Sequence, residues 1–240
     1  MMRDEWVLVA LVLLWGGLLF GGFLFGERNE SNTRRMPTWT RMASSFTLVV
    51  VAWLSYGLVM EGELARFALL IAVGMTLGFI GDLFMAQLLP LEKYVLGGMG
   101  AFGLGHVAYI AALLWMDAHL PQAGAGRGAA LVFWLLIGIV GWYLIVFRGQ
   151  KATALHWAAL PYALLLATTT GLASGLALHS PLFLSLALGA ALFLLSDLIL
   201  GAHLFNGLQF PLIHDVVWLL YGPGQMLIVL SAALAVGRQT

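Results

Sequence analysis

The sequence predicts an all-α protein, a polytopic transmembrane helical bundle with about eight spans. Hydrophobic residues make up 62% of the 240-residue chain and charged residues only 9%, whereas a soluble protein has about 25% charged residues. Several apolar runs reach the roughly 20 residues that a helix needs to cross a bilayer. Because most of the chain is expected inside the bilayer, we predict one integral membrane domain over residues 1–240.

Turn residues between the apolar runs divide the chain into eight predicted helices. The first run is too long for the core of a signal peptide and has no A-x-A-like cleavage site after it, so we expect it to span. Pro90 is expected to end the third helix, and Gly222-Pro223-Gly224 to break the eighth. The predicted helices cover residues 5–25, 43–60, 66–89, 94–116, 129–147, 154–178, 182–205 and 213–236.

Charge and cysteine content exclude several classes of function. Lys plus Arg equal Asp plus Glu at 11 each, so no net field favours nucleic acid, and we expect no nucleic-acid partner. The absence of cysteine excludes disulfides, thiol nucleophiles and thiolate metal sites. Positive residues are concentrated in the odd-numbered loops, which favours a cytoplasmic location for those loops.

Two halves of the chain carry related motifs around polar residues in apolar surroundings. The first half has Gly74-x-x-Leu77-x-x-x-Gly81-Asp82, and the second has Gly189-x-x-Leu192-x-x-x-Ser196-Asp197. The helix after each motif continues the similarity, with Gly103-Leu-Gly105-His106 matching Gly222-Pro-Gly224-Gln225. These repeats predict two pseudo-symmetric four-helix halves, roughly residues 1–120 and 121–240.

The two intramembrane aspartates are the main candidates for a functional site. A carboxylate in hydrocarbon is costly and by default marks function. Gly74, Gly78 and Asp82 share one helix face, and small residues mark the face where a neighbouring helix packs closely. Asp82 is therefore expected to point into the bundle, and the same count applies to Asp197. Each aspartate alone could instead serve only a helix–helix hydrogen bond.

Parallel repeats would bring both aspartates together at one depth. Because two neighbouring carboxylates in a low dielectric do not easily both ionise, one is expected to hold a proton. An acid paired with a base has this arrangement.

Other polar residues permit more than one interpretation. His106 is equally compatible with a packing role and a catalytic role, and Tyr109 and Tyr221 are more typical of packing. Three residues near the last loop suggest a metal site, but no ligand spacing recurs, so polarity at the membrane interface is the favoured explanation. These residues are His203, His214 and Asp215.

The same motifs resemble those of the YhhN-type lysoplasmalogenase family, whose members are eight-helix integral membrane proteins. The matching segments are Gly81-Asp82, GAFGLGHVAY at 100–109, GAALFLLSD at 189–197, YGPGQ at 221–225 and PTWTR at 37–41. One departure is Ser45-Phe46, where members often carry Lys-Pro. The resemblance covers most of the chain.

This resemblance implies hydrolysis of the vinyl ether bond of lysoplasmalogens, which gives a fatty aldehyde and a glycerophospho-headgroup compound. Such a cleavage needs a proton donor, a nearby negative charge and a base for water, much as glycosidases use two carboxylates. We therefore predict paired catalytic aspartates with no metal or other cofactor. The predicted catalytic residues are Asp82, Asp197 and His106, and the predicted substrate-binding residues are Gln225, Tyr109, Tyr221 and Ser196.

A membrane location suits this substrate. The lysophospholipid could enter sideways from among the membrane lipids, with its alkenyl chain against the Gly-rich helices and its headgroup near the odd loops. We expect the protein in the inner membrane of a bacterium. The alternative is a proton-coupled secondary transporter, because transporters also use repeats, intramembrane acids and broken helices.

Overall fold

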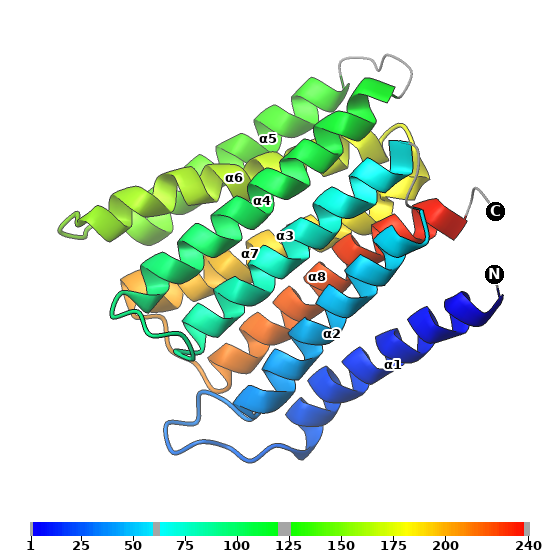
Figure 1. Cartoon of the computed structure of the whole chain (residues 1–240). Coiled ribbons are helices and arrows are strands. Elements are labelled where there is room, and N and C mark those ends of the chain that lie inside the picture. Colours follow the sequence, from blue (N-terminus) through cyan, green and yellow to red (C-terminus); the bar gives the residue numbers. More distant parts are fainter. Residues whose placement is uncertain (1, 60–62, 120–125, 238–240) are drawn as a thin grey trace.

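The described part of the chain folds as a bundle of eight α-helices (Figure 1). The structure is a computed structural model, and it describes residues 2–59, 63–119 and 126–237. These residues contain no β-strand, which confirms the all-α prediction. The helices are α1 (Met2–Phe25), α2 (Thr38–Gly57), α3 (Glu63–Met85), α4 (Tyr94–His119), α5 (Gly126–Gly141), α6 (Ala154–Ala177), α7 (Leu184–Asn206) and α8 (Ile213–Gly237), with a π-helix η1 (Trp142–Phe147) and a 3₁₀-helix η2 (Pro181–Phe183).

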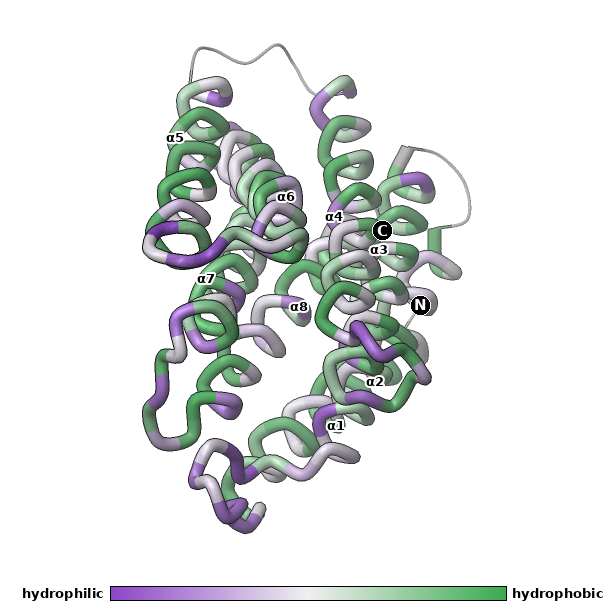
Figure 2. The backbone as a smooth tube through the Cα atoms, turned by 90° about the vertical axis from the view of Figure 1, so that its left-hand side faces the viewer, coloured by the Kyte–Doolittle hydropathy of each residue, from purple (hydrophilic) through white to green (hydrophobic). Residues whose placement is uncertain are grey.

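Seven helices in the described part of the chain are long and apolar enough to cross a membrane. The chain is therefore a multi-pass membrane protein. Figure 2 shows hydrophobic residues along the helices and hydrophilic residues mostly at their ends and in the loops. Of the described α-helices, α2 alone does not meet the length and hydropathy criteria for a membrane span. It has 20 residues, but its buried positions include several Ser and Thr side chains and Arg41, so polar groups line its inner side.

Consecutive helices pack in pairs. Helix α1 lies along α2, α3 along α4, α5 along α6, and α7 along α8. Helices α1 and α5 lie at opposite edges of the bundle, and α1 begins at the end of the bundle where α8 ends (Figure 1). A two-fold relation between the halves stays a prediction.

Most helix ends lie within three residues of the sequence-based expectation when η1 is counted with α5, and two ends differ by more. Helix α3 ends at Met85 rather than at residue 89, because Gln87 adopts a left-handed conformation with φ of 58°. Leu88 N–H then bonds the Leu83 carbonyl at 2.9 Å, and Gln87 N–H bonds the Phe84 carbonyl at 2.9 Å, which is a Schellman motif. Helix α2 begins at Thr38, five residues earlier than predicted, because the polar residues of its first turns face the protein interior.

The predicted break in α8 is wrong. The helix continues through Gly222-Pro223-Gly224, although Pro223 has no backbone N–H to donate. A Cβ atom added at Gly224 would lie 2.9 Å from the Gly189 carbonyl oxygen, and one added at Gly189 would lie 2.6 Å from the Gly224 carbonyl oxygen. These glycines therefore permit α7 and α8 to cross in backbone contact.

Candidate active site

Asp82 lies near the C-terminal end of α3, in the middle of the bundle, and is 3% exposed. Its Oδ2 atom accepts a hydrogen bond of 2.5 Å from Ser45 Oγ on α2 and one of 3.0 Å from Tyr221 OH on α8. A buried carboxylate needs such donors because its charge is otherwise uncompensated. The inward direction predicted for Asp82 is therefore correct.

A chain of hydrogen bonds leads to Asp82 from the interior. Tyr109 OH donates to Gln225 Oε1 at 3.0 Å, and Gln225 Nε2 donates to Tyr221 OH at 3.2 Å. Tyr221 then uses its own proton for Asp82. The structure thus joins three of the predicted substrate-binding residues into one network, in which every donor points toward the Asp82 carboxylate.

Two glycines of α3 make room for this network. A Cβ atom added at Gly74 would overlap the Tyr109 ring, and one added at Gly78 would lie 2.7 Å from Gln225 Nε2. The prediction that this glycine face marks close packing is confirmed. Close approach between helices places the polar side chains against the α3 backbone.

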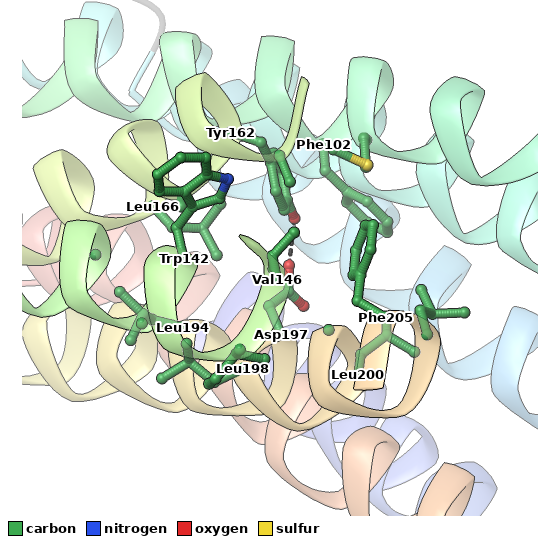
Figure 3. Close-up of a pocket in the computed structure, with 18 of the residues that line it drawn as sticks. Phe102, Trp142, Val146, Tyr162, Leu166, Leu194, Asp197, Leu198, Leu200 and Phe205 are labelled. Carbon is green, nitrogen blue, oxygen red and sulfur yellow. Dashed lines mark hydrogen bonds between the residues drawn. The ribbon is translucent and has the colours of Figure 1, made fainter. Parts of the chain in front are cut away.

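Asp197 on α7 has different surroundings. It is half-buried and lines an apolar cavity of about 90 Å³ (Figure 3). Tyr162 OH on α6 donates to Asp197 Oδ2. Ser196 Oγ lies 3.3 Å from Asp197 Oδ1 but also donates to the Phe193 carbonyl at 2.7 Å. Because a hydroxyl has one proton, Tyr162 is the firm donor to Asp197.

The cavity beside Asp197 is a narrow apolar space among α3, α4, α5, α6, α7 and η1. Figure 3 shows the Asp197 carboxyl group and the Tyr162 hydroxyl as a polar pair among aromatic and aliphatic side chains. Part of its wall is the π-helix η1, and such helices frequently occur at functional sites. Lining residues include Phe102, Trp142, Val146, Leu166, Leu194 and Phe205.

His106 on α4 is 1% exposed and bonds α6 rather than either aspartate. Its Nδ1 atom lies 2.9 Å from Thr169 Oγ1, and Thr169 Oγ1 donates to the Leu165 carbonyl at 3.0 Å. His106 Nδ1 therefore carries the proton, by inference from the hydrogen-bond network. His106 Nε2 is a buried acceptor that has no hydrogen-bond partner within the described part of the chain, and the His106 ring lies 4.7 Å from the ring of Phe193 between centroids.

Each aspartate has its own hydroxyl donors, and the Phe102 ring, which lines the cavity beside Asp197, packs on Tyr221, the donor to Asp82. Asp82 is enclosed, and Asp197 faces a cavity. Sequence reasoning did not assign Ser45, Tyr162 or Thr169 to the site. Ser45 was visible only as a departure from the family pattern, and no spacing within one helix reveals a partner on another. Among the residues that the structure describes, no three His, Asp or Glu side chains form a group that could hold a metal.

The fold and the site define an integral membrane protein with a buried carboxyl group, Asp82, and a half-buried one, Asp197, beside an apolar cavity inside a helical bundle. The model of the YhhN family matches residues 36–232, and the chain belongs to this family. Comparison with curated proteins and with solved structures gave no match.

Proposed function

We propose that this protein is a membrane hydrolase that cleaves the vinyl ether bond of lysoplasmalogens to a fatty aldehyde and a glycerophospho-headgroup compound. The observation that carries the proposal is the Asp197 carboxyl group in the wall of a narrow apolar cavity. Phe102 of the same wall packs on Tyr221, which donates a hydrogen bond to the Asp82 carboxylate. Membership of the YhhN family is consistent with this reaction. We also propose the inner membrane of a bacterium as the location.

The proposed chemistry uses one acid and one base. The acid transfers its proton to the β-carbon of the vinyl ether, and the carbon attached to oxygen becomes an oxocarbenium ion. Water adds to that carbon and gives its proton to the base. The resulting hemiacetal collapses by breaking the bond between this carbon and the glycerol oxygen, which releases the aldehyde and an alcohol. Two carboxyl groups perform comparable steps in glycosidases.

The different hydrogen bonds of the two aspartates support different catalytic roles for them. Asp82 accepts firm bonds from Ser45 and Tyr221, and bonds to an ionised acceptor are roughly twice as strong as neutral ones. Negative charge is therefore better stabilised on Asp82. Asp197 has one firm donor, Tyr162, and faces apolar walls. We assign Asp197 as the proton donor and Asp82 as the carboxylate that stabilises the cation and activates water.

His106 is proposed to position the water. Its unpartnered Nε2 atom can accept a hydrogen bond from a water molecule or from the hydroxyl group of the hemiacetal. Gln225 donates a hydrogen bond to the Tyr221 hydroxyl, and Tyr109 donates one to Gln225. Both residues are proposed to orient Tyr221 and so to act on Asp82 indirectly. Ser196 is fully buried and is proposed to support the Asp197 side chain.

The predicted break in the eighth helix was one of the features that favoured a transporter, and α8 has no such break. Transporters of this kind bind substrate at discontinuous helices, whereas α8 is continuous through Pro223. The hydrolase therefore has the stronger support.

The proposal is tested with the purified protein in detergent, supplied with a lysoplasmalogen in D₂O. We expect fatty aldehyde with one deuterium on the carbon next to the carbonyl, because that carbon takes its proton from an exchangeable acid. The saturated 1-O-alkyl analogue should give no aldehyde. Release of no aldehyde, or of aldehyde without deuterium, would contradict the proposed reaction.

A further inference from the structure

A second cavity, polar and larger, opens at the loop end of the bundle next to the first. Its volume is about 430 Å³. It borders the α1–α2 loop, the α3–α4 connection and the facing ends of α7 and α8. Lining residues include Asn29, Thr33, Arg34, Arg41, His203 and His214. Met85, Leu200 and Leu204 border both cavities, so the polar cavity adjoins the apolar one.

Arg41 is the central charge of the polar cavity. It is 8% exposed, and none of the residues described bonds its Nε atom. Its Nη2 atom donates to Thr38 Oγ1 at 3.1 Å, and its guanidinium lies 5.4 Å from the centre of the Trp218 ring. Among the residues that the structure describes, no carboxylate lies within ion-pair distance of it.

Such an arginine is costly without a ligand. Asp215 and Asp82 attract Arg41 from beyond ion-pair distance, but a buried cation without a direct ion pair recovers only part of the hydration energy that it loses. Arg41 also lies close to the start of α2, where the helix dipole favours anions and disfavours cations. An anion bound in the polar cavity would offset both costs.

Arg34 supplies a second positive charge to the polar cavity, and hydrogen bonds fix the loop that carries it. Its Nη1 atom donates to Thr38 Oγ1 at 3.3 Å, so one threonine hydroxyl contacts both arginines. The buried Asp215 carboxylate of α8 accepts the backbone N–H groups of Arg35 at 2.5 Å and Met36 at 3.0 Å. This attachment fixes the α1–α2 loop over the cavity before any ligand arrives.

We infer that the polar cavity binds the phosphate group of a single-chain phospholipid through Arg34 and Arg41, while the hydrocarbon chain occupies the apolar cavity. This inference rests on the proposed function and names the part of the substrate that the arginines recognise. Two guanidinium groups match the fixed geometry of phosphate oxygens. His214 adds a further ring nitrogen, and no carboxylate is among the described lining residues.

The two cavities adjoin each other, as the phosphate and the vinyl ether of the substrate do, since only the glycerol backbone separates these two groups. Met85 follows Asp82 by three residues, and Leu200 follows Asp197 by three residues, so each aspartate lies about 5 Å along its helix from a residue that borders both cavities. A phosphate at the arginines would place the ether bond, a few covalent bonds away, beside the carboxyl groups.

The test compares two substrates with the same alkenyl chain, 1-O-alkenyl-glycerophosphoethanolamine and 1-O-alkenylglycerol, which lacks the phosphate. Wild-type protein should prefer the first in kcat/KM. Arg41→Gln and, separately, Arg34→Gln should reduce that preference about tenfold or more, since a hydrogen bond to a charged group contributes about that factor. The loss should come from KM for the phosphorylated substrate. Arg28→Gln, an exposed arginine of the same loop, should keep the full preference.

Binding separates this inference from the proposed reaction. Titration calorimetry with the non-cleavable 1-O-alkyl-glycerophosphoethanolamine should show weaker binding to Arg41→Gln and Arg34→Gln, but not to Arg28→Gln, even if no aldehyde is ever released. Inorganic phosphate alone should bind far more weakly, because it cannot use the apolar cavity. Folded Arg41→Gln and Arg34→Gln proteins that retain lipid affinity would overturn the inference. So would inorganic phosphate that binds as tightly as the lipid.

Discussion

Ser45 Oγ on α2 donates a hydrogen bond of 2.5 Å to Asp82 Oδ2 on α3. Arg41 lies four residues before Ser45 on the same helix face, about 6 Å along the axis, and lines the polar cavity. One face of α2 therefore carries both a donor to the buried carboxylate and the proposed phosphate ligand. This explains why α2 is the least apolar of the helices although its inner side is buried.

The Ser45 hydroxyl should contribute directly to turnover. Ser45→Ala leaves Asp82 with Tyr221 as its only firm donor, so the carboxylate is less well stabilised. We expect kcat for aldehyde release to fall about tenfold or more, with little change in KM. Ser55→Ala is the matched control, because Ser55 is equally buried in α2 and donates only to the Val51 carbonyl. Equal kcat in both variants would contradict this role.

The Tyr162 hydroxyl should matter for the acid. Tyr162→Phe keeps the ring that borders the cavity but removes the donor to Asp197, so the carboxyl group loses its orientation. Steady-state kinetics should show a kcat at least about tenfold lower. Tyr143→Phe, at an exposed position on η1, should behave as wild type. A Tyr162→Phe protein with the kcat of the wild type would contradict a catalytic contribution of this hydrogen bond to Asp197.

The glycine face of α3 should be sensitive to one added methyl group. A Cβ atom at position 78 would lie 2.7 Å from Gln225 Nε2, so Gly78→Ala must displace part of the hydrogen-bond network. We expect a loss of about 1–3 kcal/mol in stability, measured as a lower Tm in detergent. Gly100→Ala meets open space and should not lower Tm. If both variants had the same Tm, the close contact at Gly78 would have no energetic consequence.

Asp215 should hold the α1–α2 loop. Asp215→Ala removes the acceptor of the Arg35 and Met36 N–H groups, and leaving buried donors unpaired costs about 1–3 kcal/mol each. Trypsin should then cut after Arg34 or Arg35 faster than in the wild type. Cleavage after the exposed Arg28 gives an internal reference, because that site should be cut at the same rate in both proteins. Unchanged cleavage after Arg34 and Arg35 would contradict the attachment.

Most of the helices could be predicted from the sequence, because a long apolar run that crosses a bilayer must satisfy its backbone hydrogen bonds internally, and an α-helix does so within one segment. The discrepancies have local causes. Gln87 ends α3 in a left-handed conformation that glycine normally supplies, so the stop was not recognisable. Gly222-Pro223-Gly224 is a strong local breaking signal, but the contact with Gly189 makes a continuous helix favourable there.

The candidate site was only partly predictable. Asp82 and Asp197 stand out because a carboxylate in an apolar helix is rare. Their hydroxyl partners do not, because Ser45 and Tyr162 lie on other helices and such contacts depend on how the helices cross. Arg41 precedes the helix predicted over residues 43–60, and nothing in its local sequence indicates that it is buried.

The central claim is that the Asp197 and Asp82 carboxyl groups together cleave a vinyl ether. The most direct measurement is aldehyde release from a lysoplasmalogen by purified wild-type, Asp197→Asn and Asp82→Asn proteins, each checked for folding by its Tm. Asp117→Asn, at the end of α4 and outside the site, is the matched control. The account predicts that wild type and Asp117→Asn release aldehyde and that both site variants lose at least about a hundredfold in kcat, within the range of general acid–base catalysis. A folded Asp197→Asn protein with wild-type turnover would contradict it.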